Sequence, residues 1–188
     1  MLREKAMEIL DCESSYGKPL ENHCLRLAEF SMALAESEGI EMDEDLIFAA
    51  CYLHDIGLCV KDPTEKNYLK RGLKFVRGKV QNWQLDEHQA RVLEDVMLYS
   101  HSVSSVPGIS HQGDVVRRAV SVEHSFGRIS QGLDSTVRRS VFARYPRRGF
   151  NRVLLSFFKI AIVEDGPKEL VRIFFPDKPL SGDSFIGS

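Results

Sequence analysis

The chain has 188 residues, with 43% hydrophobic and 28% charged side chains and a formal net charge of −2. This composition is typical of one ordinary globular domain, and it excludes global disorder. The near-neutral charge excludes binding to nucleic acid or a lipid surface through bulk charge alone. The sequence has no apolar run of the roughly 18 residues that a membrane span needs and no apolar signal core at its N-terminus, so we expect a cytoplasmic protein.

Helical periodicity runs through almost the whole chain, and alternating strand patterns are nearly absent. Gly39 is typical of a helix C-terminus, and Asp86 followed by Gln89 is typical of a capping box. The predicted helices, in chain order, are 2–11, 20–38, one from an Asp43 cap to Gly57, one from an Asp86 cap to about His101, 115–130 after an Asp114 cap, one from an Asp134 cap to Pro146, and a buried helix over 150–164, followed by a break at Gly166-Pro167 and a last turn before Pro176.

These elements predict an all-α, single-domain helical bundle over residues 1–188. Its parts are a core that carries the chemistry at about 20–130, C-terminal helices at 134–175 and a polar tail at 176–188. Between 58 and 84 the pattern is less regular, because Gly72 and Gly78 weaken any single long helix there.

The charge is distributed unevenly along the chain. Residues 1–66 hold 15 acidic and 6 basic side chains, whereas residues 112–160 hold 3 acidic and 10 basic ones. Six arginines fall within 15 residues with no acid between them: Arg138, Arg139, Arg144, Arg147, Arg148 and Arg152. Guanidinium groups suit phosphate or carboxylate partners, but a solvated basic face or a subunit contact explains the cluster equally well.

Four polar side chains lie on, or directly beside, otherwise apolar helical faces: His23, His54, Asp55 and Glu123. A buried carboxylate is unfavourable unless it is paired, hydrogen-bonded or bound to a cation. Each of the four alone could be a satisfied core side chain. Together, two imidazoles and two carboxylates facing one interior indicate a site for a divalent ion such as Mn²⁺, Fe²⁺, Co²⁺, Ni²⁺, Zn²⁺ or Mg²⁺.

The run Ala-Ala-Cys-Tyr-Leu-His-Asp-Ile-Gly-Leu at 49–58, with Asn22-His23 ahead of it, resembles the HD-domain superfamily of metal-dependent phosphohydrolases. The pattern of that superfamily is His…His-Asp…Asp, on an all-α fold. The resemblance extends over roughly residues 20–130. It implies that His23, His54 and Asp55 are the first three metal ligands.

The fourth ligand departs from the superfamily pattern. The matching segment begins at Ala119, and Val120 stands where the superfamily usually has Asp. Glu123, one turn later on the same apolar stripe, is the predicted substitute. His124, about 100° further around the helix, is the second choice.

Two further histidines are distinguished by their positions. His101 ends its helix on a stripe with Leu93 and Met97, and the resemblance implies that it reaches the site as a substrate or second-metal residue. His88 lies about 220° away around the same helix, so we expect it on the surface.

The leading hypothesis is a metal-dependent hydrolase that acts on a small phosphorylated metabolite, with a nucleotide as the first candidate. Asp55 and His101 would be catalytic, and Arg144, Arg147 and Arg148 would bind the anionic substrate. We expect neither a nucleic acid nor a membrane partner, and the sequence leaves a homo-oligomer open.

Two alternatives remain. The segment Tyr-Pro-Arg-Arg-Gly-Phe at 145–150 resembles the cyanamide-hydratase-like branch, which implies addition of water to a nitrile-like molecule. An apolar, arginine-poor pocket at the metal would favour that alternative. The altered fourth ligand favours a different one, an HD module that binds a ligand or partner without catalysis.

Overall fold

The computed structural model describes residues 1–176 of the chain. Within that range all regular structure is helical and no β-strand forms, which confirms the predicted all-α fold. None of the helices in this range combines the length and apolarity needed to cross a bilayer. The predicted polar tail lies, apart from Pro176, outside the described residues.

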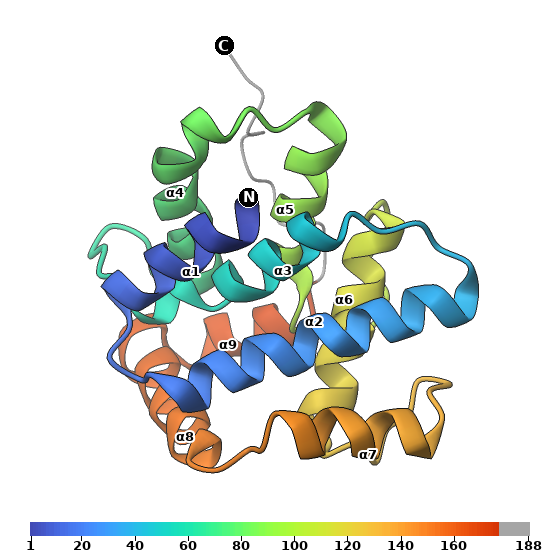
Figure 1. The fold of residues 1–188 in the computed structure, drawn as a ribbon. Helices are drawn as coiled ribbons and strands as arrows, with labels where there is room; N and C mark the ends of the chain where they lie inside the picture. The colour runs from blue at the N-terminus through green and yellow to red at the C-terminus, as the bar shows by residue number, and fades with distance from the viewer. Residues whose placement is uncertain (177–188) are drawn as a thin grey trace.

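The helices follow one another with short connections (Figure 1). In chain order they are α1 (Leu2–Glu13), α2 (Lys18–Glu38), α3 (Glu44–Leu53), the 3₁₀ turn η1 (Ile56–Leu58), α4 (Tyr68–Val80), the 3₁₀ turn η2 (Gln81–Trp83), α5 (Glu87–Tyr99), α6 (His111–His124), α7 (Ser135–Arg144), α8 (Phe150–Ile160), the π-helical turn η3 (Ala161–Asp165) and α9 (Pro167–Phe174).

Most predicted helix ends are confirmed. Gly39 closes α2 in the left-handed conformation, with φ of 66°. The Asp86 side chain accepts from the Gln89 amide and completes a capping box at α5. Asp134 caps α7 by accepting from the amide of Thr136.

Three predicted helix ends are wrong, and one of them is the C-terminus of the helix predicted over 115–130, which ends at His124. The third helix stops at Leu53 rather than Gly57, so the histidine and aspartate that follow it lie in a tight turn. The helix predicted over 115–130 is α6, and it begins four residues earlier, at His111, because Ser110 caps it by accepting from the amide of Gly113. Asp114 instead lies in the first turn of α6 and pairs with Arg117 and Arg118 further along that helix.

The prediction of a buried helix over 150–164 is also wrong in part. The segment is helical, but Leu155 and Val163 are 70% and 73% exposed. Only one side of α8 packs inward, through Phe150, Val153 and Phe157. The long apolar run therefore packs one side of the helix against the protein and leaves apolar side chains exposed on the other side.

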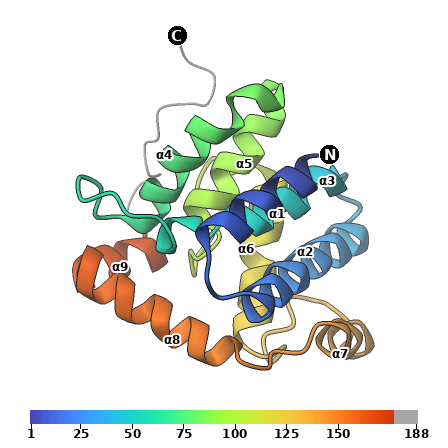
Figure 2. The ribbon, with the colours of Figure 1, turned by 60° about the vertical axis from the view of Figure 1, so that its left-hand side comes forward.

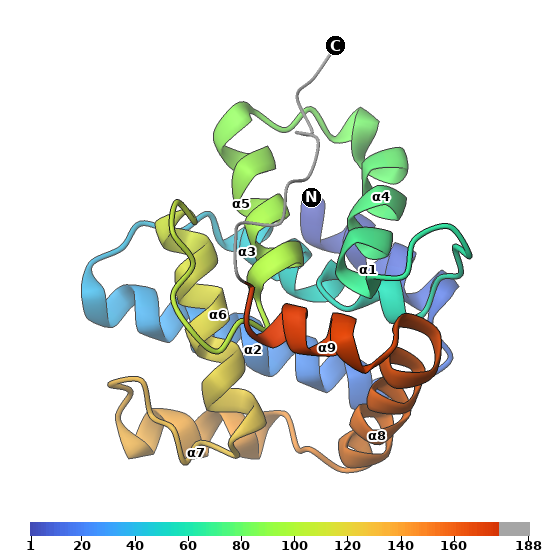
Figure 3. The same cartoon turned by 180° about the vertical axis from the view of Figure 1, so that it is seen from behind.

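The centre of the fold is α2, which crosses α6 and packs against α3, while α1 covers α3 from outside (Figure 1). α4 and α5 lie side by side, and α5 also packs against α3 and α6 (Figure 2). Seen from behind, α9 and α8 cover the face on which the ends of α3, α5 and α6 approach α2 (Figure 3). The geometry of that enclosed face is set by backbone packing as well as by side chains.

Two glycines allow this packing at the turn after α3. A Cβ on Gly57 would lie 1.9 Å from the carbonyl oxygen of Tyr68, and one on Gly72 would lie 2.9 Å from the amide nitrogen of Gly57. The start of α4 is also tied to the C-terminal helices, because Asp165 accepts from the Tyr68 amide at 3.0 Å and from Arg71 at 2.9 Å. These contacts fix η1, α4 and η3 around one point.

Candidate metal centre

Two helices bring His23, His54 and Asp55 together. His23 is buried on the second turn of α2, and His54 and Asp55 follow the last residue of α3. Nε2 of His23 lies 3.4 Å from Nε2 of His54 and 3.9 Å from Oδ2 of Asp55, and the latter two atoms are 3.1 Å apart. All three side chains are buried.

The orientation of His54 suits it to bind a cation. Its Nδ1 lies 2.8 Å from the carbonyl oxygen of Cys51, which can only accept, so Nδ1 carries the proton. Nε2 is then left with a free lone pair aimed at His23 and Asp55. Fixing a histidine tautomer through its second nitrogen is the usual arrangement of metal-binding imidazoles.

The donor atoms fit a divalent ion. Two ligands bound at about 2.1 Å lie roughly 3.0–3.4 Å apart at octahedral or tetrahedral angles, which is close to the separations among these three atoms. Oδ1 of Asp55 is buried and has no hydrogen-bond partner. Mixed nitrogen and oxygen donors suit the borderline divalent metals.

The charge states of His23 and Asp55 also favour a cation, whereas Asp55 raises the pKa of His54 against the effect of burial. Burial lowers the pKa of His23 and so favours the neutral ring. Burial alone would raise the pKa of Asp55, but His54 and His101 hold it well below its ordinary range. A neutral imidazole and an ionised carboxylate are the forms that bind metals.

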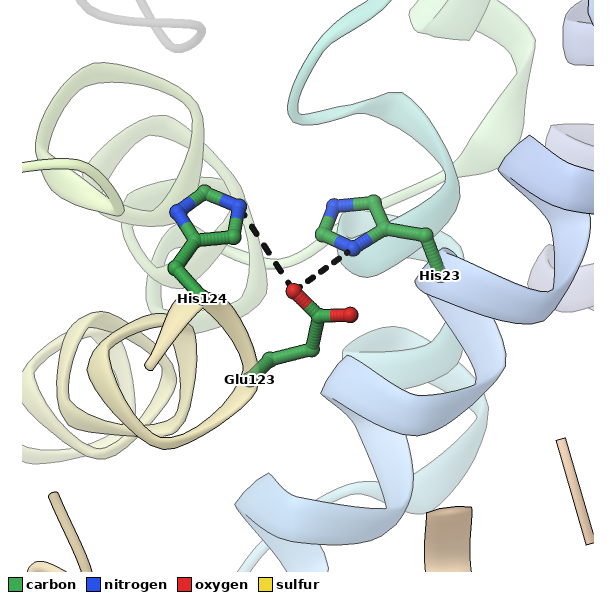
Figure 4. Close-up of side chains that lie close together, drawn as sticks. All are labelled: His23, Glu123 and His124. Atoms are coloured by element: carbon green, nitrogen blue, oxygen red, sulfur yellow. Dashed lines mark ion pairs between the residues drawn. The ribbon is translucent and has the colours of Figure 1, made fainter. Parts of the chain in front are cut away.

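Glu123, the predicted fourth ligand, lies on the other side of the His23 ring. Its Oε2 is 3.3 Å from Nδ1 of His23 and 3.7 Å from Nε2 of His124 (Figure 4). Among the described residues, two groups could hold an ion: His23, His54 and Asp55 in one, and His23, Glu123 and His124 in the other. His23 is common to both, and Glu123 is not in the group that contains Asp55.

The other oxygen of Glu123 is occupied by arginines. Oε1 accepts from Nε and NH2 of Arg26 at 2.8 and 2.6 Å, and from NH1 of Arg147 at 2.8 Å. Arg147 NH1 also donates to the Glu123 carbonyl oxygen at 2.7 Å. Glu123 and Arg26 are fully buried, so the carboxylate is neutralised inside the protein without an ion.

His101 reaches the centre from beyond the end of α5. Its Nε2 lies 3.7 Å from Oδ1 of Asp55, and its Nδ1 lies 3.2 Å from the hydroxyl of Ser100 and 3.5 Å from that of Tyr68. Burial lowers the pKa of His101 to about 3 and that of His124 to about 4. Both rings are therefore neutral at pH 7.

A pocket of about 270 Å³ opens beside these groups. Its lining consists of Asp55, Tyr68, His101, His124, Leu154, Phe157, Phe158, Ala161, Leu170 and Phe174. His88 and His111 are exposed and lie outside it, as predicted for His88. The pocket joins the metal centre to the inner faces of α8 and α9.

The predicted substrate arginines do not line this pocket. Arg144 is paired with Glu29 at 3.0 Å on the surface, and Arg147 is held by Glu123. Arg148 is exposed. Their role in substrate binding stays a prediction, because none of the three is among the residues that line the pocket.

The HD domain family model matches residues 20–106. This segment contains His23, His54, Asp55 and His101, in the geometry described above. Over this segment the chain is similar to the HD domain family. No curated protein matches the chain.

Members of the HD-domain superfamily are mostly metal-dependent phosphohydrolases that bind divalent ions. The match ends before α6, so it does not reach Glu123. The role of Glu123 must therefore be argued from its contacts in this chain.

Two parts of the site are not found by the sequence argument. Arg26 follows His23 by three residues on the inward face of α2, and a charge in that position is a signal that a buried opposite charge faces it. The apolar wall from α8 and α9 gives no comparable signal, because its phenylalanines and leucines look like ordinary core residues.

Proposed function

We propose that the chain is a metal-dependent hydrolase whose ion is held by His23, His54 and Asp55. The observation that carries the proposal is the convergence of two imidazole nitrogens and one carboxylate oxygen at 3.1–3.9 Å in a buried site. An ion bound there supplies a water of lowered pKa and a positive charge that polarises the substrate.

Asp55 and His101 are the residues that face both this centre and the pocket. Oδ1 of Asp55 has no hydrogen-bond partner, so it can accept a hydrogen bond from the attacking water. The neutral His101, with Nδ1 near Ser100 and Tyr68, presents Nε2 to the reacting group. A buried carboxylate and a neutral imidazole side by side are suited to positioning water and taking up its proton.

Glu123 supports the same centre through His23. A carboxylate beside Nδ1 favours the proton on that nitrogen and leaves Nε2 free for an ion, as carboxylates behind metal-binding histidines do in many proteins. Glu123 is also a candidate fourth ligand, because its Oε2 lies 3.3 Å from Nδ1 of His23 and 3.7 Å from Nε2 of His124.

A phosphorylated metabolite, with a nucleotide as the first candidate, is the substrate that the superfamily favours. In this chain the ion itself would have to neutralise the phosphate, because the described residues that line the pocket include no lysine or arginine. The apolar lining supports a second candidate, addition of water to a nitrile-like molecule. The substrate and the amide product of that reaction are both uncharged.

The test is a screen of the Mn²⁺-, Co²⁺- and Ni²⁺-loaded protein with two readouts. Phosphate release from phosphorylated metabolites detects the first reaction, and amide formation from small nitriles, followed by mass spectrometry, detects the second. The control is the double variant His54→Ala plus Asp55→Ala. Metal-dependent turnover absent from the control supports the proposal. Tight metal binding without turnover in either screen contradicts it and supports a ligand-binding module.

A further inference from the structure

The pocket beside the metal centre has two chemically distinct ends. One end carries the polar groups of Asp55, His101, His124 and Tyr68. The other end is formed by side chains of α8, η3 and α9: Leu154, Phe157, Phe158, Ala161, Leu170 and Phe174. An occupant that touches both ends must have a polar group and a hydrocarbon part.

The described lining is poorly matched to a polyanion. It contains one carboxylate, from Asp55, and two histidines, but among the described residues neither lysine nor arginine. A di- or triphosphate in this space would face a carboxylate and six apolar side chains. Charged groups without paired partners are unfavourable in such surroundings.

The volume limits the size of the occupant. Ligand pockets for drug-sized molecules hold about 300–1,000 Å³, and an apolar cavity of about 150 Å³ is enough for benzene. The 270 Å³ here therefore corresponds to one ring or a short alkyl chain with a small polar group.

We infer that the substrate is a small, largely uncharged molecule whose hydrocarbon part binds between α8 and α9 while its reacting group lies at Asp55 and His101. This inference rests on the proposed function and names the substrate class of that same site. The apolar wall is held over the centre by Asp165, whose contacts with Tyr68 and Arg71 join η3 to the start of α4.

The test uses hydroxamic acids, which chelate metals through a small polar head and differ only in their tails. Binding of acetohydroxamic, hexanohydroxamic and benzohydroxamic acid to the Co²⁺-loaded protein is measured by calorimetry, with metal-free protein as the reference. Burial of each methylene strengthens binding by up to about fourfold. We expect the two longer acids to bind at least about tenfold more tightly than acetohydroxamic acid.

Matched variants locate the tail. Leu154 lines the pocket and is half-buried, whereas its neighbour Leu155 is 70% exposed and points away. Leu154→Ala should reduce the advantage of the longer acids by about three- to tenfold, whereas Leu155→Ala should leave it unchanged. Leu170→Ala and the exposed Val171→Ala form an independent pair on α9, in case one variant fails to fold.

The outcomes separate this inference from the proposed function. If acetohydroxamic acid binds only the metal-loaded protein but the longer acids bind no more tightly, the pocket proposal is overturned and the metal centre stands. An equal effect of Leu154→Ala and Leu155→Ala, repeated by the α9 pair, overturns it too. If no hydroxamate binds in a metal-dependent way, the proposed function fails, and the inference fails with it.

Discussion

Nδ1 of His23 lies 3.3 Å from Oε2 of Glu123, while Nε2 of the same ring faces His54 and Asp55. The carboxylate is in turn fixed by Arg26 and Arg147. The histidine is thus placed between a buried ion pair on one side and the candidate metal centre on the other. This relationship gives Glu123 a way to act on a metal without coordinating it.

Glu123→Gln tests that role. We expect the affinity for Co²⁺ to fall by about 10- to 100-fold, the usual effect of losing a group that orients a metal-binding histidine, while the visible spectrum of the bound Co²⁺ keeps its shape. Competition with a chelator gives the affinity, and absorption spectroscopy gives the ligand set. A changed spectrum would assign Glu123 to the ligands themselves, as the sequence predicts.

We also expect Glu123→Gln to lower the free energy of unfolding by an amount that depends on pH. Burial alone would raise the pKa of Glu123, but His23, His124 and Arg26 hold it well below its usual range. A carboxylate with a lowered folded-state pKa stabilises the fold above its unfolded pKa of about 4.3, and that stabilisation disappears as the pH falls toward the folded value.

For metal-free protein we therefore expect Glu123→Gln to lower the free energy of unfolding by about 3–5 kcal/mol at pH 7, because Arg26 is left buried without its counter-ion. The difference from wild type should shrink toward pH 3 in urea denaturation. The exposed Glu8 is the control, and Glu8→Gln should stay within about 0.5 kcal/mol at both pH values. A difference for Glu123→Gln that does not change with pH would contradict the pairing.

The close packing after α3 predicts opposite effects of an added Cβ at Gly57 and at Gly78. Gly57→Ala places a Cβ against the backbone of α4, so we expect a loss of about 1–3 kcal/mol or more and weaker metal binding, because His54 and Asp55 lie directly before it. Gly78 has open space around its Cα within α4, so Gly78→Ala should gain about 0.5–1 kcal/mol. Thermal unfolding of both variants measures this, and equal effects would refute the packing argument.

The arginines outside the pocket give a test of phosphate recognition. Arg148 is exposed and does not line the pocket, so Arg148→Ala should change the affinity of the Co²⁺-loaded protein for inorganic phosphate by no more than about twofold. Calorimetry measures this directly. A loss beyond tenfold would return Arg148 to the substrate site and favour an anionic substrate.

The helical fold is predictable from the sequence because its signals are local. The capping box at Asp86 and the left-handed Gly39 are determined by residues three or four apart. The start of α6 is missed because Ser110 and Asp114 are both good caps. Ser110 is held in place by donating its amide hydrogen to Asp95, a contact between separate helices that forms only on folding.

The candidate site is predictable to the extent that it is encoded by contiguous motifs. His54 and Asp55 are adjacent, and His23 lies on a marked helical stripe, so all three are named before the structure is known. The partners of Glu123 are not, because Arg26 lies 97 residues away and is joined to it only by folding. The sequence alone does not show whether Arg147 pairs with Glu123 or binds a phosphate group.

The metal content of the purified protein tests the central claim most directly. After loading with Mn²⁺, Co²⁺ or Ni²⁺ and removal of free ions, elemental analysis should find a stoichiometric divalent ion in the wild type and little in the folded double variant His54→Ala plus Asp55→Ala. Far-ultraviolet circular dichroism establishes that the variant is folded. Equal metal content in the two proteins would contradict a metal centre at His23, His54 and Asp55.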